Sequence, residues 1–205
     1  MTPSFLYFDL GCVLLNFSLP KMLAQIAGLA GLDVETVKDV VFNSGMQLGY
    51  EAGRINSQEF YDRFCAATDT CPDFDAMSFA AADIFELNSS IVPVVAQLRA
   101  AGYRMGILSN TCPIHWDYCR RRFPTVIDLF DVYVLSYRVK AVKPEPAIFQ
   151  AAVELAGVTA NKIFFVDDIP GHVEGAKAAG FDAVQYTDTP RLAADLRVRG
   201  VAFNY

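Results

Sequence analysis

Short apolar runs recur along the chain and alternate with longer amphipathic stretches. The runs at 5–8, 104–108, 131–136, 162–166 and 182–186 are continuous and have the length of strands buried on both faces. Helical periodicity in the stretches between and after the later runs predicts helices over 91–101, 116–122, 146–156, 170–179 and 190–199. Strands that alternate with helices predict a parallel sheet with helices on both faces, which is an α/β fold.

The pattern differs between the first run and residue 88. Residues from about 17 to 87 have apolar positions at helical spacing and no strand-like run. Helices are expected to begin at side chains that can cap a first turn, namely Ser18, Asp33, Asn56 and Asp75, and the first two helices to end near Gly28 and Gly45. Asn56 and Glu59 have the spacing of a capping box. This stretch therefore predicts an insert of four helices between the first strand and the rest of the sheet.

Length and composition limit the class of protein. The chain has 205 residues, of which 53% are hydrophobic and 20% charged, which suits one large globular domain or one domain with a small insert. The formal net charge of −6 and the lack of a basic run argue against a nucleic-acid surface. The sequence lacks a signal peptide and a membrane-span pattern, so a cytoplasmic protein with no membrane partner is expected. The five cysteines form no Cys-x-x-Cys pair and the chain has two histidines, which argues against zinc and favours free thiols.

A carboxylate stands at the end of the first apolar run. Burying the charge of Asp9 is costly unless the carboxylate is paired or binds a metal, although an aspartate at a strand end can also be a simple turn residue. Ser109 and Asn110 end the second run, and Asp167 and Asp168 end the fourth. These residues are expected to meet, because the carboxyl ends of parallel strands line the ligand crevice of an open α/β sheet.

Three carboxylates in one crevice indicate a cation, because they cannot all stay ionised without one. Oxygen ligands without histidine or cysteine favour Mg²⁺. Lys143, in the segment 142–146, can supply a second positive charge. A carboxylate nucleophile, Mg²⁺ and a lysine together suit phosphoryl transfer through an aspartyl-phosphate.

Four segments occur in the order of the motifs of one known family. Residues 8–11, 108–111, 143–144 and 166–168 are similar, in that order, to the four motifs of the haloacid dehalogenase-like hydrolases. Residues 174–176 also resemble the helix after the fourth motif. The resemblance implies a Rossmann-like parallel sheet domain over 1–16 and 88–205, with the first and fourth strands adjacent. It also implies a small helical cap over 17–87, inserted after the first strand.

The resemblance also implies a role for each motif residue. Asp9 would be the nucleophile and a metal ligand, and Gly11 would offer its backbone carbonyl to the metal. Asp168 would bind the metal directly, and Asp167 directly or through water. Phosphate oxygens would be held by the Ser109 side chain and by Asn110, and Lys143 would neutralise both Asp9 and the phosphate. The branch with Asp-Leu-Gly in its first motif is similar to glucose-1-phosphate phosphatases, so a Mg²⁺-dependent phosphatase of a small phosphorylated metabolite, such as a sugar phosphate, is expected.

One departure from the family pattern leaves alternatives open. Most phosphatases of the family have a second aspartate, a general acid and base, where this chain has Gly11. General acid–base catalysis is worth roughly 10²–10⁴-fold. Glu51, His115 or a water molecule are candidates to replace the missing group. The alternatives are a 2-haloacid dehalogenase, which the pair Asp167 and Asp168 disfavours, and a catalytically weak protein that binds phosphate or a partner.

Several further residues are interpreted less specifically. A cap loop with Tyr50, Glu51 and Arg54 could contact the substrate, although a solvated loop is the simpler interpretation. Lys140 and His172 lie close to the motifs and receive no role. Cys12 and Cys112 are interpreted as small buried side chains and not as a redox pair. The order of the acidic residues argues against a receiver-like phosphoacceptor domain, and the chain is expected to be a monomer or a homodimer.

Overall fold

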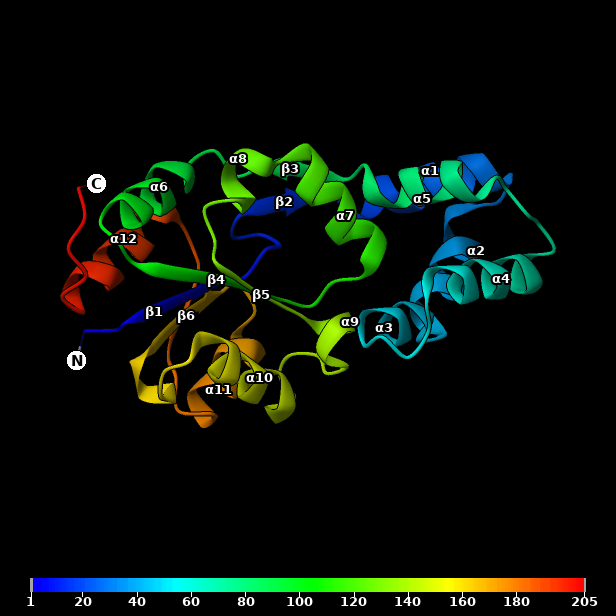
Figure 1. Cartoon of the computed structure of the whole chain (residues 1–205). Helices are drawn as coiled ribbons and strands as arrows, with labels where there is room; N and C mark the ends of the chain where they lie inside the picture. Colours follow the sequence, from blue (N-terminus) through cyan, green and yellow to red (C-terminus); the bar gives the residue numbers. More distant parts are fainter. Residues whose placement is uncertain (1, 205) are drawn as a thin grey trace.

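A five-stranded parallel sheet forms the centre of the molecule (Figure 1). The computed structural model describes residues 2–204. The sheet order is β5-β4-β1-β6-β7, and the strands are β1 (Phe5–Phe8), β4 (Arg104–Ser109), β5 (Val132–Leu135), β6 (Ile163–Asp167) and β7 (Asp182–Gln185). Phe8 pairs with Ile107 of β4 on one side and with Val166 of β6 on the other. The expected parallel sheet is confirmed, and so is the adjacency of its first and fourth strands in chain order.

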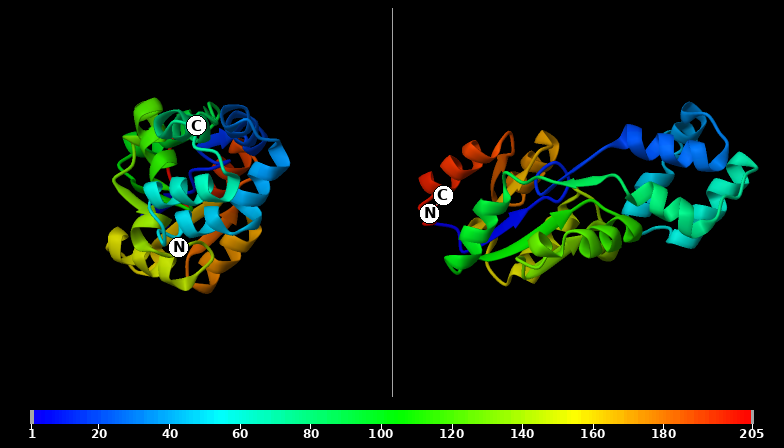
Figure 2. Two further views of the ribbon diagram at one scale, coloured as in Figure 1. Left: turned by 90° about the vertical axis from the view of Figure 1, so that its right-hand side faces the viewer. Right: turned by 90° about the horizontal axis from the view of Figure 1, so that it is seen from above.

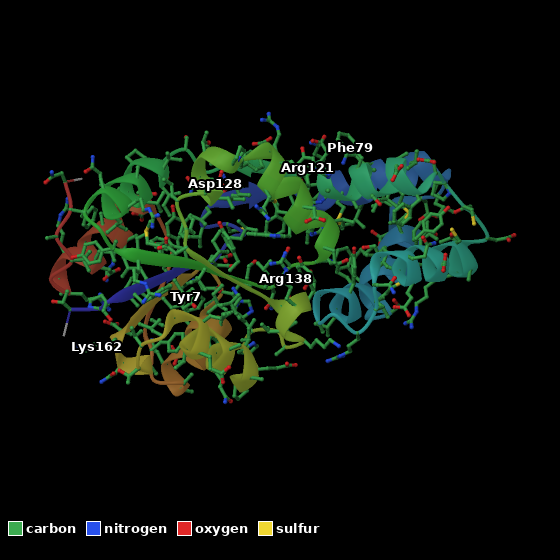
Figure 3. All side chains as sticks on the ribbon, in the orientation of Figure 1. Tyr7, Phe79, Arg121, Asp128, Arg138 and Lys162 are labelled. Atoms are coloured by element: carbon green, nitrogen blue, oxygen red, sulfur yellow. The ribbon has the colours of Figure 1, made fainter. Side chains whose placement is uncertain are left out.

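Helices cover both faces of this sheet (Figures 1 and 2). One face carries α6 (Val92–Ala100), α7 (Pro113–Arg122), α8 (Pro124–Ile127) and α12 (Thr189–Val198), and the other carries α10 (Pro146–Ala156) and α11 (Pro170–Ala178). Successive side chains of β1 alternate between the two apolar clusters: Leu6 and Phe8 belong to one, Phe5 and Tyr7 to the other. Tyr7 points toward α10, where its hydroxyl donates a 2.9 Å hydrogen bond to the carbonyl of Ala152 (Figure 3).

Five α-helices form a separate lobe with its own apolar cluster (Figure 1). The helical lobe consists of α1 (Leu19–Ala30), α2 (Val34–Lys38), α3 (Met46–Glu51), α4 (Ser57–Thr68) and α5 (Phe74–Ala82), with a π-helix at Asp39–Asn43. It extends beyond the carboxyl ends of the sheet strands (Figures 1 and 2). The loop between α3 and α4 contacts the sheet domain at Gly53. A Cβ atom there would lie 2.3 Å from the carbonyl oxygen of Tyr137 in α9 (Ser136–Val139). Gly53 also has a φ of +64°, so both the contact and the conformation require glycine.

A two-stranded antiparallel ribbon joins the helical lobe to the sheet domain. Its strands are β2 (Leu15–Phe17) and β3 (Phe85–Leu87), and Leu15 pairs with Leu87. The prediction of a strand-free segment over 17–87 is therefore wrong at both of its ends. Each strand has three residues and a partly exposed face, which is too short for an alternating pattern to emerge from the sequence.

Several helix boundaries agree with the sequence and others do not. The Ser18 side chain caps α1, and Asn56 and Glu59 form the expected capping box of α4. However, α1 continues through Gly28 to Ala30, and the helix expected from Asp33 to Gly45 ends at Lys38 and is followed by the π-helix. Among the later boundaries, α5 is capped by Asp73 in place of Asp75, and α7 begins at Pro113 in place of residue 116. The short elements α3, α8, α9 and the 3₁₀-helix Ala160–Lys162 were not expected.

Two findings concern the whole described chain. Within residues 2–204, the helices are all too short or too polar to cross a bilayer. The five cysteines are free thiols, as expected. Cys112 is buried in the apolar cluster of the helical lobe, whereas Cys12 is half-buried and follows β1 with a φ of +55°.

Candidate functional site

Three carboxylates meet at the carboxyl ends of β1 and β6. Asp9 directly follows β1, Asp167 is the last residue of β6, and Asp168 comes next. The pairing of Phe8 with Val166 places the two strand ends level with each other. One carboxylate oxygen from each of the three residues lies within 4.8 Å of the others. This set of hard oxygen donors fits Mg²⁺.

A buried lysine lies against two of these carboxylates. The Lys143 side chain is fully buried, and its Nζ is 2.9 Å from Oδ1 of Asp9. The same ammonium donates hydrogen bonds to Oδ2 of Asp167 and to the carbonyl of Leu108. Asn110 fixes the backbone of Lys143: its Oδ1 accepts from the Lys143 N–H at 2.7 Å, and its Nδ2 donates to the Lys143 carbonyl at 3.0 Å. Thus the residue after β4 positions the lysine between the ends of β1 and β6.

The charges in this cluster depend on one another. Burial raises the pKa of Asp9 to about 7; the ammonium of Lys143 opposes this rise and the charge of Asp167 adds to it. Burial also raises the pKa of Asp168, with a further contribution from Asp167. For Lys143, burial is outweighed by the two aspartates, which raise its pKa and keep it charged. The cluster therefore has fewer positive charges than carboxylates, as expected for a site that binds a cation.

His172, for which no role was predicted, is a further partner of the cluster. Its Nδ1 lies 3.1 Å from both oxygens of Asp167, and Oδ1 of Asp167 also accepts a hydrogen bond from the backbone N–H of Ile169. Burial acts against ionisation of Asp167, but His172 and Lys143 hold its pKa below the usual value. Both oxygens of Asp167 thus have protein partners, whereas Asp168 is half-buried and more open.

A cavity of about 80 Å³ lies between the carboxyl ends of the sheet strands and the helical lobe. Gly11, Ser109 and Asn110 line it from the sheet domain, and Gln47 and Glu51 line it from the lobe. The rest of the lining is His115, Thr111 and apolar residues, namely Leu10, Phe17, Leu19, Met22, Phe42, Ile84 and Phe85. Two of the residues expected to hold phosphate, Ser109 and Asn110, therefore line the cavity. Its lobe side has few polar groups.

The three loop residues predicted to contact a substrate lie in different places. Glu51 lines the cavity. Tyr50 is 1% exposed, packs on Phe60, and shares a 2.6 Å hydrogen bond with Ser57 inside the lobe. Arg54 is exposed and lines a separate hollow on the lobe. The structure thus brings only Glu51 of these three to the cavity.

Gln47 is a cavity residue that the sequence analysis missed. Its Nε2 donates a 2.8 Å hydrogen bond to Oε1 of Glu51, one helical turn later in α3. The i,i+4 spacing of a glutamine and a glutamate was a signal for this pair, but α3 itself was not expected. Burial raises the pKa of Glu51, and both the hydrogen bond from Gln47 and the charge of Lys143 oppose the rise.

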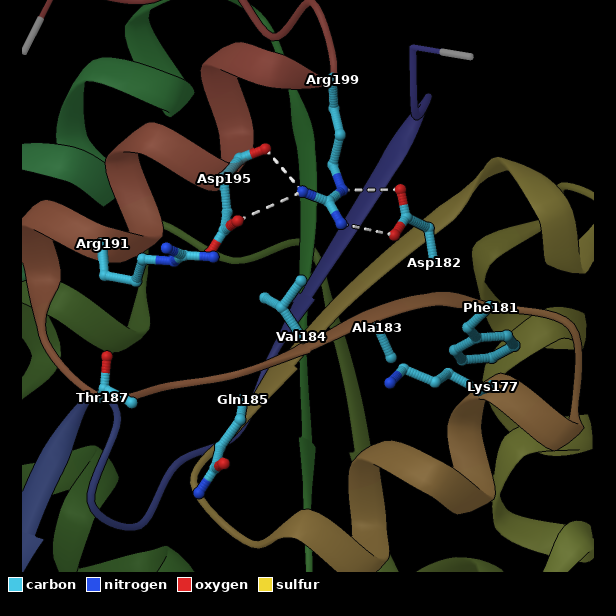
Figure 4. Close-up of a pocket in the computed structure, with 10 residues that line it drawn as sticks. All are labelled: Lys177, Phe181, Asp182, Ala183, Val184, Gln185, Thr187, Arg191, Asp195 and Arg199. Atoms are coloured by element: carbon cyan, nitrogen blue, oxygen red, sulfur yellow. Dashed lines mark hydrogen bonds and ion pairs between the residues drawn. The ribbon is translucent and has the colours of Figure 1, made fainter.

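A larger hollow, of about 670 Å³, lies elsewhere, over edge strand β7 and helix α12 (Figure 4). Its charged residues are already paired: Arg199 contacts Asp182 and Asp195, and Arg191 contacts Asp195 (Figure 4). Arg199 lies 2.6 and 2.9 Å from the two oxygens of Asp182. These ion pairs neutralise the arginines, so we place the candidate site at the carboxylate cluster and not here.

Comparisons with known proteins show what this chain is similar to. The family described as haloacid dehalogenase-like hydrolase has a model that matches residues 21–180. D-ribitol-5-phosphate phosphatase from Bacteroides thetaiotaomicron is 26% identical over 196 residues, a match that covers 93% of each chain. A phosphatase from Mycobacterium tuberculosis is 34% identical over 91 residues, and that match spans 44% of this chain and only 42% of the relative. Among solved structures, a HAD family enzyme from Bacteroides thetaiotaomicron in complex with magnesium and inorganic phosphate has a TM-score of 0.83 and 27% identity, covering 93% of this chain and 98% of that one.

Proposed function

Because the chain belongs to the haloacid dehalogenase-like hydrolases, we propose that it is a Mg²⁺-dependent phosphatase that hydrolyses a small phosphorylated metabolite. The observation that carries this proposal is the buried lysine between two of the three carboxylates at the ends of adjacent strands. The similarity to D-ribitol-5-phosphate phosphatase supports a substrate of the sugar-phosphate or polyol-phosphate type.

The donor set supports a specific division of the metal ligands. Asp9 and Asp168 would hold Mg²⁺ directly, with the backbone carbonyl of Gly11. Asp167 would act through water, because both of its oxygens already accept hydrogen bonds from other residues of the chain. Bound Mg²⁺ would supply positive charge that keeps Asp9 ionised and offsets the charge of the phosphate.

Each remaining residue has a role that its position supports. Asp9, at the end of β1, would attack phosphorus and form an aspartyl-phosphate, with release of the alcohol. Lys143 would stabilise the negative charge that Asp9 and the phosphoryl oxygens share. Ser109 and the backbone of Asn110 line the cavity beside this point and would bind phosphoryl oxygens. Attack of water on the aspartyl-phosphate would then release phosphate and restore Asp9.

The helical lobe would be the part that selects the substrate. We propose that residues 17–87 form a cap over a sheet domain of residues 1–16 and 88–205. The cavity lies between the cap and the sheet domain and is lined by residues of both. The part of the substrate beyond the phosphate would face the lobe, where Glu51 is the residue of the predicted trio that lines the cavity. A cytoplasmic location and a monomeric or homodimeric state belong to the same proposal.

The test is phosphate release from a panel of phosphomonoesters, with Mg²⁺ and with EDTA, alongside chloride release from 2-chloropropionate. We expect Mg²⁺-dependent phosphate release from at least one sugar or polyol phosphate and no chloride release. Metal-independent chloride release would favour the dehalogenase. Binding of Mg²⁺ and phosphate without turnover of any substrate would favour the binding protein that Gly11 suggests.

A further inference from the structure

The proposed reaction lacks a proton donor in the sheet domain. Departure of an alkoxide from phosphorus requires a proton, and the side chain of Gly11 cannot provide one. In an in-line displacement the leaving oxygen lies on the side of phosphorus opposite the nucleophile. Asp9 follows β1, and the next two residues, Leu10 and Gly11, line the cavity that reaches the lobe. A phosphoryl group on Asp9 would therefore have its leaving oxygen directed toward the lobe. The missing donor should therefore be found among the residues that line the lobe side of the cavity.

Two titratable side chains line this cavity, Glu51 and His115. The Nε2 of His115 lies 3.2 Å from the backbone carbonyl of Ala81. A carbonyl only accepts hydrogen bonds, so Nε2 carries the ring proton and donates it in the hydrogen bond to the Ala81 carbonyl. Burial keeps the ring neutral, since it lowers the pKa of His115 to about 4. Neutral His115 has no second proton to donate to a substrate.

Glu51, unlike His115, has a group that can donate a proton to a substrate. Its Oε1 accepts the hydrogen bond from Gln47, whereas Oε2 accepts none within residues 2–204, so one oxygen is fixed and the other is available. Gln47 holds the carboxyl from within the same helix, α3. Burial raises the pKa of Glu51, which favours the protonated form that an acid needs. Glu51 lines the same cavity as Ser109 and Asn110, the residues proposed to bind the phosphoryl oxygens.

We infer that Glu51 is the general acid and base of the reaction, in the role that Gly11 leaves open; this inference rests on the proposed function. As an oxygen of Asp9 bonds to phosphorus and the ester P–O bond breaks, the proton of the Glu51 carboxyl passes to the leaving oxygen and yields the alcohol. The Glu51 carboxylate then takes a proton from the water that attacks the aspartyl-phosphate. Its carboxyl is thereby restored, and the sum is phosphomonoester plus water to alcohol plus phosphate.

The test compares two substrates that differ in their need for an acid. An alkyl phosphate, such as glycerol phosphate, releases a strongly basic alkoxide, whereas p-nitrophenyl phosphate releases a weakly basic phenolate that needs no proton. The rate of alcohol release in the first turnover would be measured with Mg²⁺ by rapid mixing for the wild type, Glu51→Gln, Glu51→Asp and the exposed lobe control Glu35→Gln. The first turnover is used because the second step, in which Glu51 acts as the base, is common to both substrates. Thermal melting would check folding, and calorimetry with inorganic phosphate and Mg²⁺ would check that the site still binds.

Glu51→Gln should lower the first-turnover rate of alcohol release by roughly 100-fold or more for the alkyl phosphate and by less than about threefold for p-nitrophenyl phosphate. Glu51→Asp should recover part of the loss, and Glu35→Gln should match the wild type. Equal losses in the first-turnover rate on both substrates, in a folded, phosphate-binding Glu51→Gln variant, would overturn this inference alone. No turnover of either substrate by the wild type would overturn the proposed function, and this inference with it.

Discussion

The ammonium of Lys143 lies 2.9 Å from Oδ1 of Asp9, and neither side chain is more than 9% exposed. Asp9 comes from the end of β1, and Lys143 comes from the loop before α10. The lysine also contacts Asp167, so one buried positive charge serves two carboxylates. This arrangement explains how a charge at the end of an apolar strand is tolerated, because buried charges persist when they are paired and hydrogen-bonded.

Removing the lysine should affect both stability and activity. Lys143→Met leaves two buried carboxylates without their cation, which should lower the free energy of unfolding by about 3 kcal/mol in EDTA. Mg²⁺ should recover part of this loss, whereas phosphatase activity should stay at least roughly 100-fold below the wild type. Urea unfolding with and without Mg²⁺ measures the first effect. The control is Lys177→Met, which removes an exposed ion pair with Glu174 and should behave like the wild type.

The role of Asp168 as a metal ligand predicts a loss of metal-dependent stabilisation. At a Mg²⁺ concentration of about 100 times Kd, the wild type should gain about 2.7 kcal/mol. Asp168→Asn should weaken Mg²⁺ binding at least about tenfold, without loss of stability in EDTA, because the pKa of Asp168 is raised and its charge is unfavourable there. Thermal melts across a Mg²⁺ titration at constant ionic strength measure this. A variant that is stabilised by Mg²⁺ as strongly as the wild type would rule out Asp168 as a ligand.

The position of Gly11 allows the missing acid to be restored. A Cβ at Gly11 would lie 2.9 Å from the ring of Phe17, whose side chain is partly exposed and can move. In the Glu51→Gln background, Gly11→Asp should raise kcat for an alkyl phosphate by about tenfold. Gly11→Ala, which displaces the ring without adding a carboxyl, should give no increase. If both substitutions had the same effect, the change would be steric and not due to a new acid.

His115 should make the fold sensitive to acid. Burial lowers its pKa from 6.5 to about 4, so between these values the unfolded chain binds a proton that the folded protein does not. The free energy of unfolding contributed by this residue therefore rises with pH across the window and is lost as the pH falls. The amide of Gln in His115→Gln can still donate to Ala81. This variant should therefore lose about 3 kcal/mol less free energy of unfolding than the wild type between pH 7 and pH 4. Asp9 titrates with the opposite sign, so the informative quantity is the difference between the variant and the wild type at each pH.

The sheet and most of the candidate site follow from local sequence signals. Continuous apolar runs identify the parallel strands, and the polar residues at their ends meet because parallel strands place their carboxyl ends together. Asp9 and Asp167 are examples: their positions at two strand ends predicted a shared crevice, and the family resemblance added that their strands are adjacent. The capping residues Ser18 and Asn56 are also local signals, because each satisfies backbone groups within its own helix.

The features that were missed depend on tertiary contacts. The ribbon of β2 and β3 consists of three-residue strands that exist only because the two ends of the lobe lie side by side. Tyr50 was assigned to a substrate loop, but its ring completes the apolar cluster of the lobe, and no local pattern distinguishes those two environments. The contact of His172 with Asp167 forms because the start of α11 packs against the end of β6. The only signal in the sequence was a histidine five residues after Asp167.

The central claim is that Asp9 carries the phosphoryl group during turnover. The most direct measurement is acid quenching of the enzyme during turnover of a radiolabelled phosphomonoester with Mg²⁺, followed by digestion and identification of the labelled peptide. We expect acid-stable, base-labile label on the peptide that contains Asp9, and none in EDTA or in Asp9→Asn. Turnover by Asp9→Asn, or label on a different residue of the wild type, would contradict the account.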